Sequence, residues 1–349
     1  MLHILTLKIS FVRFIIIKFD MSGKRSSFNI ISGKYSLPVI ILVSILCWSV
    51  TLFFRAGKTQ TDSVTAGLFY NLMQEYFAPV LLTIINCVLI LGAGLLLLWL
   101  NQQFSIIRTR TLLPFLFYML FITIDAPAFF SLEGNIATFF LLIIVFYFFK
   151  SYQSKRAIEE AFNIGLLLSL GSLFSGRLLF FIPIIWIGLA YVQALSARSF
   201  FASLVGISAP YWLVFCWFLY QKDIAGFTES FHSFFQIKPL SFFDFTVAGW
   251  LKTCFSGLIT IAAVVNFRMH SFKDKIKTRV YFYLLLVLIL YVSVFMFFGI
   301  FPISEYIGIY YFSVSLFAAH LFATVNTRLS NVFFYLFLIT FIGLLFFDI

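Results

Sequence analysis

The sequence predicts an all-α, polytopic membrane protein that crosses the bilayer about eleven times. Hydrophobic residues make up 62% of its 349 positions and charged residues only 11%, whereas a soluble domain averages about 45–50% and about 25%. The apolar residues form runs close to the ~20 residues that a helix needs to cross the hydrocarbon. Runs such as 78–100 and 280–300 do not alternate with polar residues, as the strands of a membrane β-barrel would. We therefore expect helices.

Eleven spans are predicted in order along the chain. Their approximate ranges are 36–54, 78–100, 112–130, 136–149, 158–174, 178–195, 204–221, 247–266, 280–300, 309–325 and 332–348. Several of the links are short enough to form helical hairpins. No internal repeat and no soluble domain is evident, because the longest polar stretches are the loops 55–77 and 222–246. Residues 36–349 are therefore expected to form a single transmembrane domain.

The basic residues alternate between loops and predict the orientation. With the N-terminus in the cytoplasm, 18 of the 24 Lys and Arg residues fall on the cytoplasmic side, as the positive-inside rule requires. Eleven spans then place the C-terminus outside, and the bacterial inner membrane is the expected location. Most acids fall on the outer side, although acids contribute little to topology. Their bias reflects either simple solvation of outer loops or an outward-facing site that uses carboxylates.

Residues 1–35 are expected to form a cytoplasmic N-terminal segment. The first 20 residues are basic and apolar but lack a small-residue cleavage site, so a signal peptide fits poorly. Two interpretations remain open. The segment forms an amphipathic helix on the membrane surface, or translation starts at Met21, where an ordinary polar N-terminus begins.

Composition also argues against several classes of site. The net charge of +11 is explained by short basic loops between spans, and no nucleic-acid recognition motif is present. The four cysteines fall inside apolar runs without a CxxC spacing, so neither a disulfide framework nor a zinc site is expected. The four histidines are scattered. We expect no metal site and no cofactor.

The first outer loop contains two cations and two carboxylates beside the membrane: Arg55, Lys58, Asp62 and Glu75. A carboxylate there could serve as a general base or bind a metal ion. Arg55 and Lys58 match the charge of a phosphate. The alternative is a solvated loop that contains a short interfacial helix.

Two further ionisable residues stand out because they interrupt apolar runs. Asp125 lies near the outer end of the third span, where an ionisable group is costly unless it is paired or wetted, and Pro127 disturbs the helix there. Arg177 follows Ser175-Gly176 in a tight outer turn. It could bind a lipid phosphate or pair with Asp125 or Glu133. The alternative for both residues is an interfacial side chain that extends toward the headgroups.

Two more loops have a distinctive composition. The outer segment 227–245 interleaves phenylalanines with polar residues, which suits a segment that lies in the membrane interface or that lines a groove for a polyprenyl or acyl chain. The inner loop 268–279 is a basic cluster. It either attracts anionic headgroups or only anchors the topology.

A resemblance is carried by three segments in the middle of the chain. They are Glu159-Glu-Ala-Phe-Asn-Ile-Gly165 with Gly171, then Leu178-Leu-Phe-Phe-Ile-Pro183, then Ala197-Arg198-Ser with Gly206-Ile-Ser-Ala-Pro210-Tyr211. This layout resembles the GT-C class of polytopic glycosyltransferases over about residues 36–215, the first two-thirds of the chain. It resembles equally a family of uncharacterised membrane proteins from Bacteroidota.

The GT-C resemblance implies transfer of a sugar from a polyprenyl-phosphate donor at the outer face of the inner membrane. That class carries a catalytic Asp or Glu in the first outer loop, often in an acidic pair, and only Asp62 has this placement, next to Ser63. Asp62 would then activate the acceptor, and Asp125 would be a second acid. Arg55, Lys58 and Arg177 would hold the donor phosphate.

Two other classes compete with a transferase. One is a non-enzymatic membrane subunit of an envelope or secretion assembly, with other membrane proteins as its partners. The other is a transporter, but the spans lack the paired Gly/Pro breaks and midplane charges expected of that class.

Overall fold

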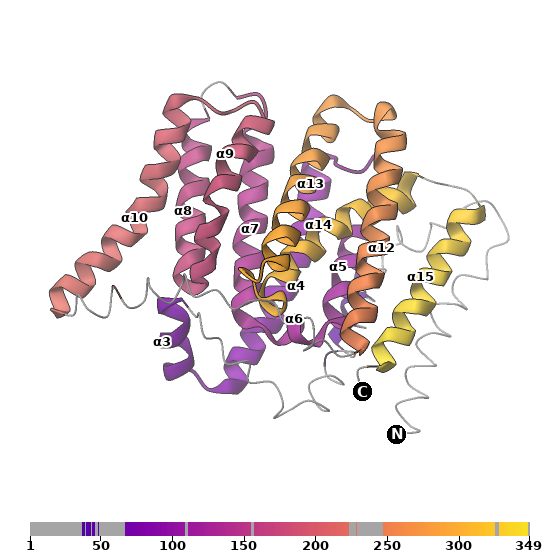
Figure 1. Cartoon of the computed structure of the whole chain (residues 1–349), viewed down its shortest axis with the longest axis horizontal. Coiled ribbons are helices and arrows are strands. Elements are labelled where there is room, and N and C mark those ends of the chain that lie inside the picture. The colour runs from indigo at the N-terminus through magenta and orange to yellow at the C-terminus, as the bar shows by residue number, and fades with distance from the viewer. Residues whose placement is uncertain are drawn as a thin grey trace.

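The protein is all-α in the part of the chain that the structure describes (Figure 1). The computed structural model describes residues 67–108, 111–154, 157–222, 247–324 and 328–347, with Thr228 and scattered positions between 37 and 48. No β-strand occurs in these ranges. The helices are α3 (Leu68–Tyr76), α4 (Pro79–Phe104), α5 (Leu113–Ile124), α6 (Ala126–Phe130), α7 (Leu132–Lys150), α8 (Ile158–Phe174), the 3-10 helix η1 (Gly176–Phe181), α9 (Ile182–Tyr191), α10 (Ala197–Gln221), α12 (Val247–His270), the 3-10 helix η3 (Ser271–Lys273), α13 (Ile276–Phe297), α14 (Ile303–Thr324) and α15 (Arg328–Phe347).

The helical character of the predicted spans is confirmed wherever the structure describes them. Each range from 78–100 onward overlaps a helix, while the first, 36–54, lies mostly outside the described residues. Six helices are long and apolar enough to cross a membrane: α4, α7, α10, α12, α13 and α14. Two shorter apolar stretches are Leu113–Ile124 and Gly176–Tyr191. These helices indicate a membrane protein, and the count of about eleven crossings stays a prediction.

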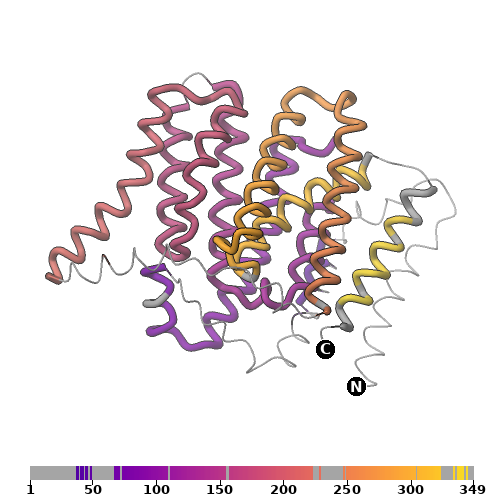
Figure 2. The backbone as a smooth tube through the Cα atoms, viewed as in Figure 1, coloured from indigo at the N-terminus to yellow at the C-terminus, as the bar shows by residue number. Residues whose placement is uncertain are grey.

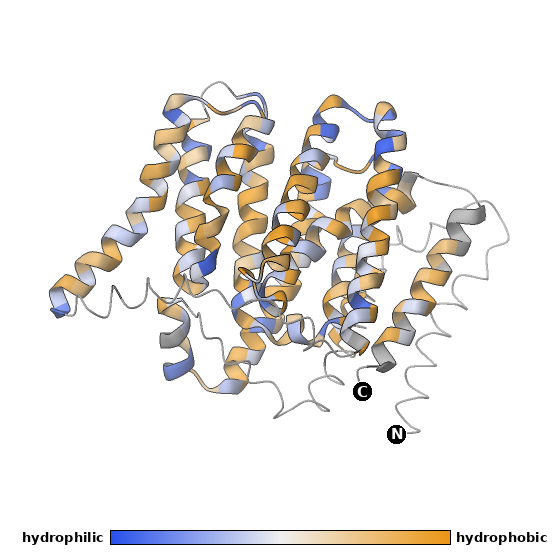
Figure 3. Ribbon diagram, in the orientation of Figure 1, coloured by the Kyte–Doolittle hydropathy of each residue, from blue (hydrophilic) through white to orange (hydrophobic). Residues whose placement is uncertain are grey.

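The long helices run side by side between two ends of the molecule (Figure 2). The turns that follow α4, α7, α9 and α12 lie together at one end, uppermost in Figure 1. We call this the basic end, because Arg108, Lys150, Arg198 and Lys273 belong to these turns or to the helix ends beside them. The other end contains α3, α6, η1 and the starts of α7 and α14. We call it the acidic end, after Asp125, Glu133 and Glu305. Between the two ends the helices are mostly apolar (Figure 3).

Helix α14 forms the centre of the molecule. It contacts α5, α6, α7, α12 and α13 and is the most enclosed of the six candidate spans. A small residue on α14 lets a neighbouring helix pack closely against it, as is typical of helices packed in a membrane. A Cβ on Gly308 would lie 2.7 Å from the Thr138 hydroxyl of α7. The rings of Phe267, Phe282 and Phe317 bring α12, α13 and α14 together.

Helices α8 and α10 pack through a pair of glycines. A Cβ on Gly165 would lie 2.3 Å from the Ser203 carbonyl oxygen, and one on Gly206 would lie 2.3 Å from that of Phe162. Each glycine therefore makes room for the other helix's backbone. Beyond this contact, α10 diverges from its neighbours toward its C-terminal end (Figure 1).

Apolar side chains cover the outer helices. Exposed examples are Val88 on α4, Trp212 on α10, Ile261 on α12 and Leu290 on α13. Such a surface would be a liability in water but suits contact with lipid chains.

Candidate functional site

The acidic end encloses a cluster of charged side chains. Glu133 is 1% exposed and Arg177 is 2% exposed. Glu305 and Arg177 both lie close enough to Glu133 to act electrostatically on it. The buried Glu133 therefore lies near a second carboxylate, that of Glu305, and near one guanidinium. Because Arg177 is enclosed, the alternative of an arginine that extends to the headgroups is wrong.

Two helix N-termini hold the carboxylates in place. Glu133 lies in the first turn of α7 and Glu305 in the first turn of α14. Ser131 caps α7 by accepting a hydrogen bond from the Gly134 N–H at 3.2 Å. Gly134 packs directly on the other helix, since a Cβ there would lie 2.0 Å from the Glu305 carbonyl oxygen. The positive ends of both helix dipoles therefore stabilise the carboxylates.

Arg177 lies in the first turn of η1, directly after the break that follows α8. Ser175 precedes it and hydrogen-bonds through its hydroxyl to the Tyr306 hydroxyl of α14 at 2.6 Å. The Tyr306 ring stacks on Phe301 with centroids 4.5 Å apart, and Phe301 stacks on Phe181 at 5.1 Å. This aromatic stack joins η1 to α14 beside the charged groups. The tight turn at Ser175-Gly176 that the sequence predicts is confirmed.

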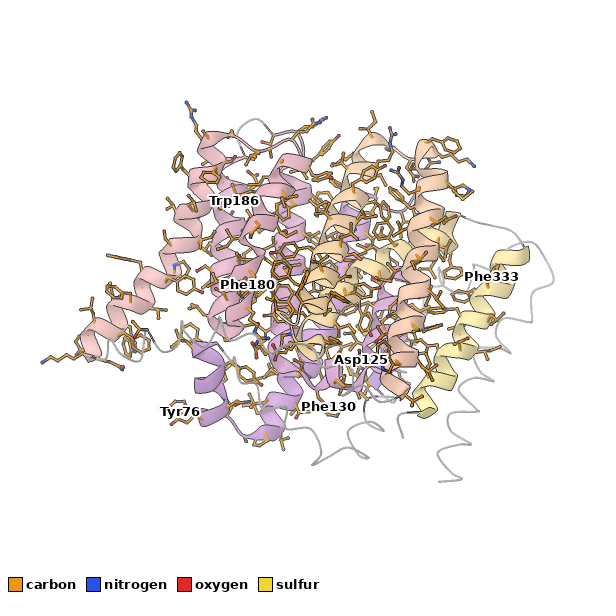
Figure 4. The ribbon with its side chains drawn as sticks, viewed as in Figure 1. Tyr76, Asp125, Phe130, Phe180, Trp186 and Phe333 are labelled. Atoms are coloured by element: carbon orange, nitrogen blue, oxygen red, sulfur yellow. The ribbon has the colours of Figure 1, made fainter. Side chains whose placement is uncertain are left out.

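Asp125 contacts a different part of α14. It separates α5 from α6, and Pro127 lies in the first turn of α6, so the helix breaks at this predicted position. Asp125 lies near the acidic end in Figure 4 and accepts a hydrogen bond from the Tyr311 hydroxyl at 2.9 Å. Tyr306 and Tyr311 are five residues apart, which separates them by about 7.5 Å along the helix and about 140° around it. Helix α14 therefore contacts the two acidic positions through different faces.

A pair of buried asparagines lies near the same end. The Asn135 side-chain amide donates to the Asn86 Oδ1 at 2.8 Å, and the Asn86 amide donates to the Phe129 carbonyl oxygen at 2.6 Å. These bonds tie α4 and α7 to α6 and satisfy the backbone where the helix is interrupted. Sequence reasoning missed this pair, because an asparagine inside an apolar run carries no signal of its partner.

Three of the predicted site residues, Arg55, Lys58 and Asp62, lie outside the described residues. The last part of this first loop, from Gly67 onward, belongs to the described residues. The Gly67 N–H donates to the Phe174 carbonyl oxygen at 3.0 Å, and Gly67 is followed by α3. The short helix that the alternative interpretation places in this loop is therefore present as α3, and it begins beside the C-terminal end of α8.

A second polar cluster lies at the basic end. Asp274 Oδ2 is 3.1 Å from His320 Nε2, and Asp274 Oδ1 is 3.4 Å from Arg108 Nε. The side chains of Asp274 and His320 are 5% and 2% exposed. The cluster joins the turns that follow α4 and α12 to the end of α14. Nothing in the sequence indicates this cluster beyond an acid within a basic loop.

In the described part of the chain, no group of three or more His, Cys, Asp or Glu side chains could hold a metal ion. The helices of the described part define an α-helical protein with several candidate membrane spans and with buried ionisable side chains. No family model and no curated protein matches the sequence, and no solved structure matches the fold.

Proposed function

We propose that this protein is an integral membrane transferase that takes a sugar or a similar group from a polyprenyl-phosphate donor. The observation that carries the proposal is the enclosure of the Arg177 guanidinium beside Glu133 and Glu305 at one end of the helices. Ionisable residues within a membrane body are costly and usually serve a function. The group of Arg177, Glu133 and Glu305 combines a phosphate-binding guanidinium with two carboxyl groups.

Each residue type has a defined role in this chemistry. The Arg177 guanidinium binds the donor phosphate. A carboxylate accepts the acceptor's hydroxyl proton while the hydroxyl oxygen bonds to the sugar's anomeric carbon. The bond from that carbon to the phosphate breaks, and the phosphate leaves with the electron pair. Glu133 is the buried acid on which Arg177 acts electrostatically. We therefore assign the role of the base to Glu133.

The first outer loop completes the proposed site. Asp62 is five residues from Gly67, so the covalent chain keeps it within about 18 Å of that residue. Gly67 bonds to Phe174, three residues before Arg177. Within the proposal, Asp62 and Asp125 are further acids, and Arg55 and Lys58 are further phosphate ligands. We place the acidic end outside the bacterial inner membrane, with the N-terminus in the cytoplasm.

The experiment is a transfer assay with the purified full chain in proteoliposomes that contain polyprenyl-phosphate-linked radiolabelled hexoses. We expect donor turnover, and we expect Glu133→Gln to lower it at least 100-fold, as loss of a general base does. Glu159→Gln is the control, because Glu159 is an exposed acid at the basic end. Unchanged turnover in Glu133→Gln contradicts the assignment of the base. No turnover of any polyprenyl-phosphate donor contradicts the function.

A second function is favoured by α10. This helix is the least enclosed of the six candidate spans, and Trp212, Trp217 and Tyr220 on it are 66%, 59% and 83% exposed. Such a face suits a non-enzymatic membrane subunit that packs against another membrane protein. A photo-crosslinker placed at Trp212 in native membranes distinguishes the two functions. A subunit gives one discrete protein adduct, whereas a lipid-facing helix gives lipid adducts.

A further inference from the structure

The turn between α12 and α13 is amphipathic. We include in the turn the helix ends beside it, so that it comprises residues 268–279 with the 3-10 helix η3. Three apolar side chains are exposed on it: Met269 at 66%, Phe272 at 71% and Ile276 at 65%. Lys273 and Lys275 alternate with them and are exposed as well. The turn joins two candidate spans, so it lies at the depth of the headgroups if both spans cross the membrane.

The turn's acid points away from this surface. Asp274 lies between the two exposed lysines in the sequence, but its side chain is 5% exposed. It is held inside by Arg108 and His320, at 3.4 Å and 3.1 Å. The backbone assists, since the Asp274 N–H donates to the Ser271 carbonyl oxygen at 3.1 Å. The outer surface of the turn therefore presents cations without the neighbouring carboxylate.

The cations of the turn differ in how they are held. Lys277 Nζ lies over three rings, at 5.6 Å from the Phe104 centroid, 5.7 Å from Tyr281 and 5.9 Å from Tyr152. It is directed to the junction of α4, α7 and α13. Lys273 lies over the exposed ring of Phe272, at 5.4 Å. A cation beside an exposed aromatic ring matches the boundary between headgroups and acyl chains.

Arg268 is oriented by a neighbour on α13. Its Nη1 donates to the Tyr283 hydroxyl at 2.8 Å, and its guanidinium lies 5.9 Å from the Tyr283 ring centroid. This contact fixes the guanidinium at the end of α12. Arginine then has further N–H groups for an anionic oxygen, because it carries five donors.

We propose that Arg268, Lys273 and Lys275 bind the headgroup phosphate of anionic phospholipids. Phe272, Met269 and Ile276 contact the upper part of the acyl chains. The occupant is a lipid because the cations alternate with exposed apolar side chains, which a soluble anion would not require. Basic side chains beside a membrane attract anionic lipids by an amount that corresponds to about fivefold in affinity each. This inference does not depend on the transferase proposal.

The test is native mass spectrometry of the detergent-solubilised full chain, titrated with phosphatidylglycerol or with phosphatidylcholine. We expect the wild-type protein to bind phosphatidylglycerol at least tenfold more tightly. The variant Arg268→Gln/Lys273→Gln/Lys275→Gln should bind the two lipids within about twofold of each other. The control Lys150→Gln/Arg198→Gln/Lys277→Gln removes the same charge at the same end, and it should keep most of the preference.

Other outcomes overturn the proposal. A wild-type protein without a preference shows that the turn only anchors the topology. An equal loss in both triple variants shows a diffuse charge effect without a site. Phosphatidylglycerol binding that inorganic phosphate displaces at similar concentrations shows a site for free anions.

Lys273→Gln/Lys275→Gln changes only exposed side chains, so it preserves the test if the loss of the Arg268–Tyr283 contact unfolds the triple variant. It should lose about tenfold or more in preference, and a preference equal to that of the wild type overturns the proposal.

Discussion

Arg177 supplies a positive charge near the buried Glu133 at the acidic end, where Glu305 also acts on Glu133. The two carboxylates belong to α7 and α14, which contact each other directly at Gly134. Arg177 therefore couples η1 electrostatically to Glu133 of α7 and to Tyr306 of α14.

Arg177→Met tests this role through stability. We expect it to lower the free energy of unfolding by about 3–5 kcal/mol, because it removes the positive charge near the buried carboxylate of Glu133. Arg177→Met/Glu133→Gln should recover part of the loss, since one of the two charges is then absent. SDS-induced unfolding in mixed micelles measures both values.

The matched control for this prediction is Arg198→Met. Arg198 is exposed at the basic end, and a change at such a position costs within about 0.5 kcal/mol. A loss of similar size in Arg177→Met and Arg198→Met would show that the buried charges are not coupled. So would a double variant that is less stable than Arg177→Met alone.

At the scale of single residues, the sequence indicates which ionisable residues are candidates for a site, but it does not show which of them lie close together. Asp125 and Arg177 stand out because each interrupts an apolar run. The sequence suggests Glu133 as one of two possible partners of Arg177, and in the structure Arg177 acts electrostatically on Glu133. The contribution of Glu305 depends on contact between helices that are 172 positions apart in the chain, measured from Glu133 to Glu305. No local pattern encodes such a contact.

Among the helices, the observed starts correct the predicted spans in a consistent way. Two spans predicted from residues 136 and 309 begin as helices at Leu132 and Ile303. In both cases the prediction excluded an acid that occupies the first turn. A carboxylate tolerates that position because of the helix dipole, and Arg177 supplies the opposite charge. The prediction therefore omitted the turns that carry Glu133 and Glu305.

The close packing of α8 on α10 gives a prediction about elements. Gly165→Ala should lower the free energy of unfolding by about 2 kcal/mol or more, because the added Cβ would lie 2.3 Å from the Ser203 carbonyl oxygen and force the backbones apart. Gly206→Ala should behave alike. Thermal unfolding in detergent measures the change.

Gly257→Ala on α12 is the control for this pair, because nothing lies within 4 Å of a Cβ there. It should leave stability unchanged or raise it slightly, since alanine favours a helix over glycine. If Gly165→Ala were as stable as Gly257→Ala, the tight α8–α10 contact would be wrong.

Across the whole molecule, the two ends combine different charges with different burial. Cations such as Arg198, Lys273 and Lys275 are exposed at the basic end, whereas Glu133 and Arg177 are enclosed at the acidic end. Exposed cations fit the positive-inside rule. Enclosed charges have no such explanation, since acids contribute little to topology. The orientation of the molecule therefore determines which side of the membrane the proposed transfer uses.

Single-cysteine labelling tests that orientation with the full chain. Cys47, Cys87, Cys216 and Cys254 are first replaced by alanine, and then Glu75→Cys or Lys273→Cys is introduced. Both positions are exposed, at opposite ends of the molecule. A membrane-impermeant maleimide should label Glu75→Cys in intact cells and Lys273→Cys only after permeabilisation. Arg198→Cys should follow Lys273→Cys, because α10 begins at the basic end.

Labelling of Glu75→Cys and Lys273→Cys from the same side would contradict the membrane-spanning arrangement. The reverse pattern would place the cluster of Glu133, Arg177 and Glu305 on the cytoplasmic side, where a donor presented at the outer face could not reach it.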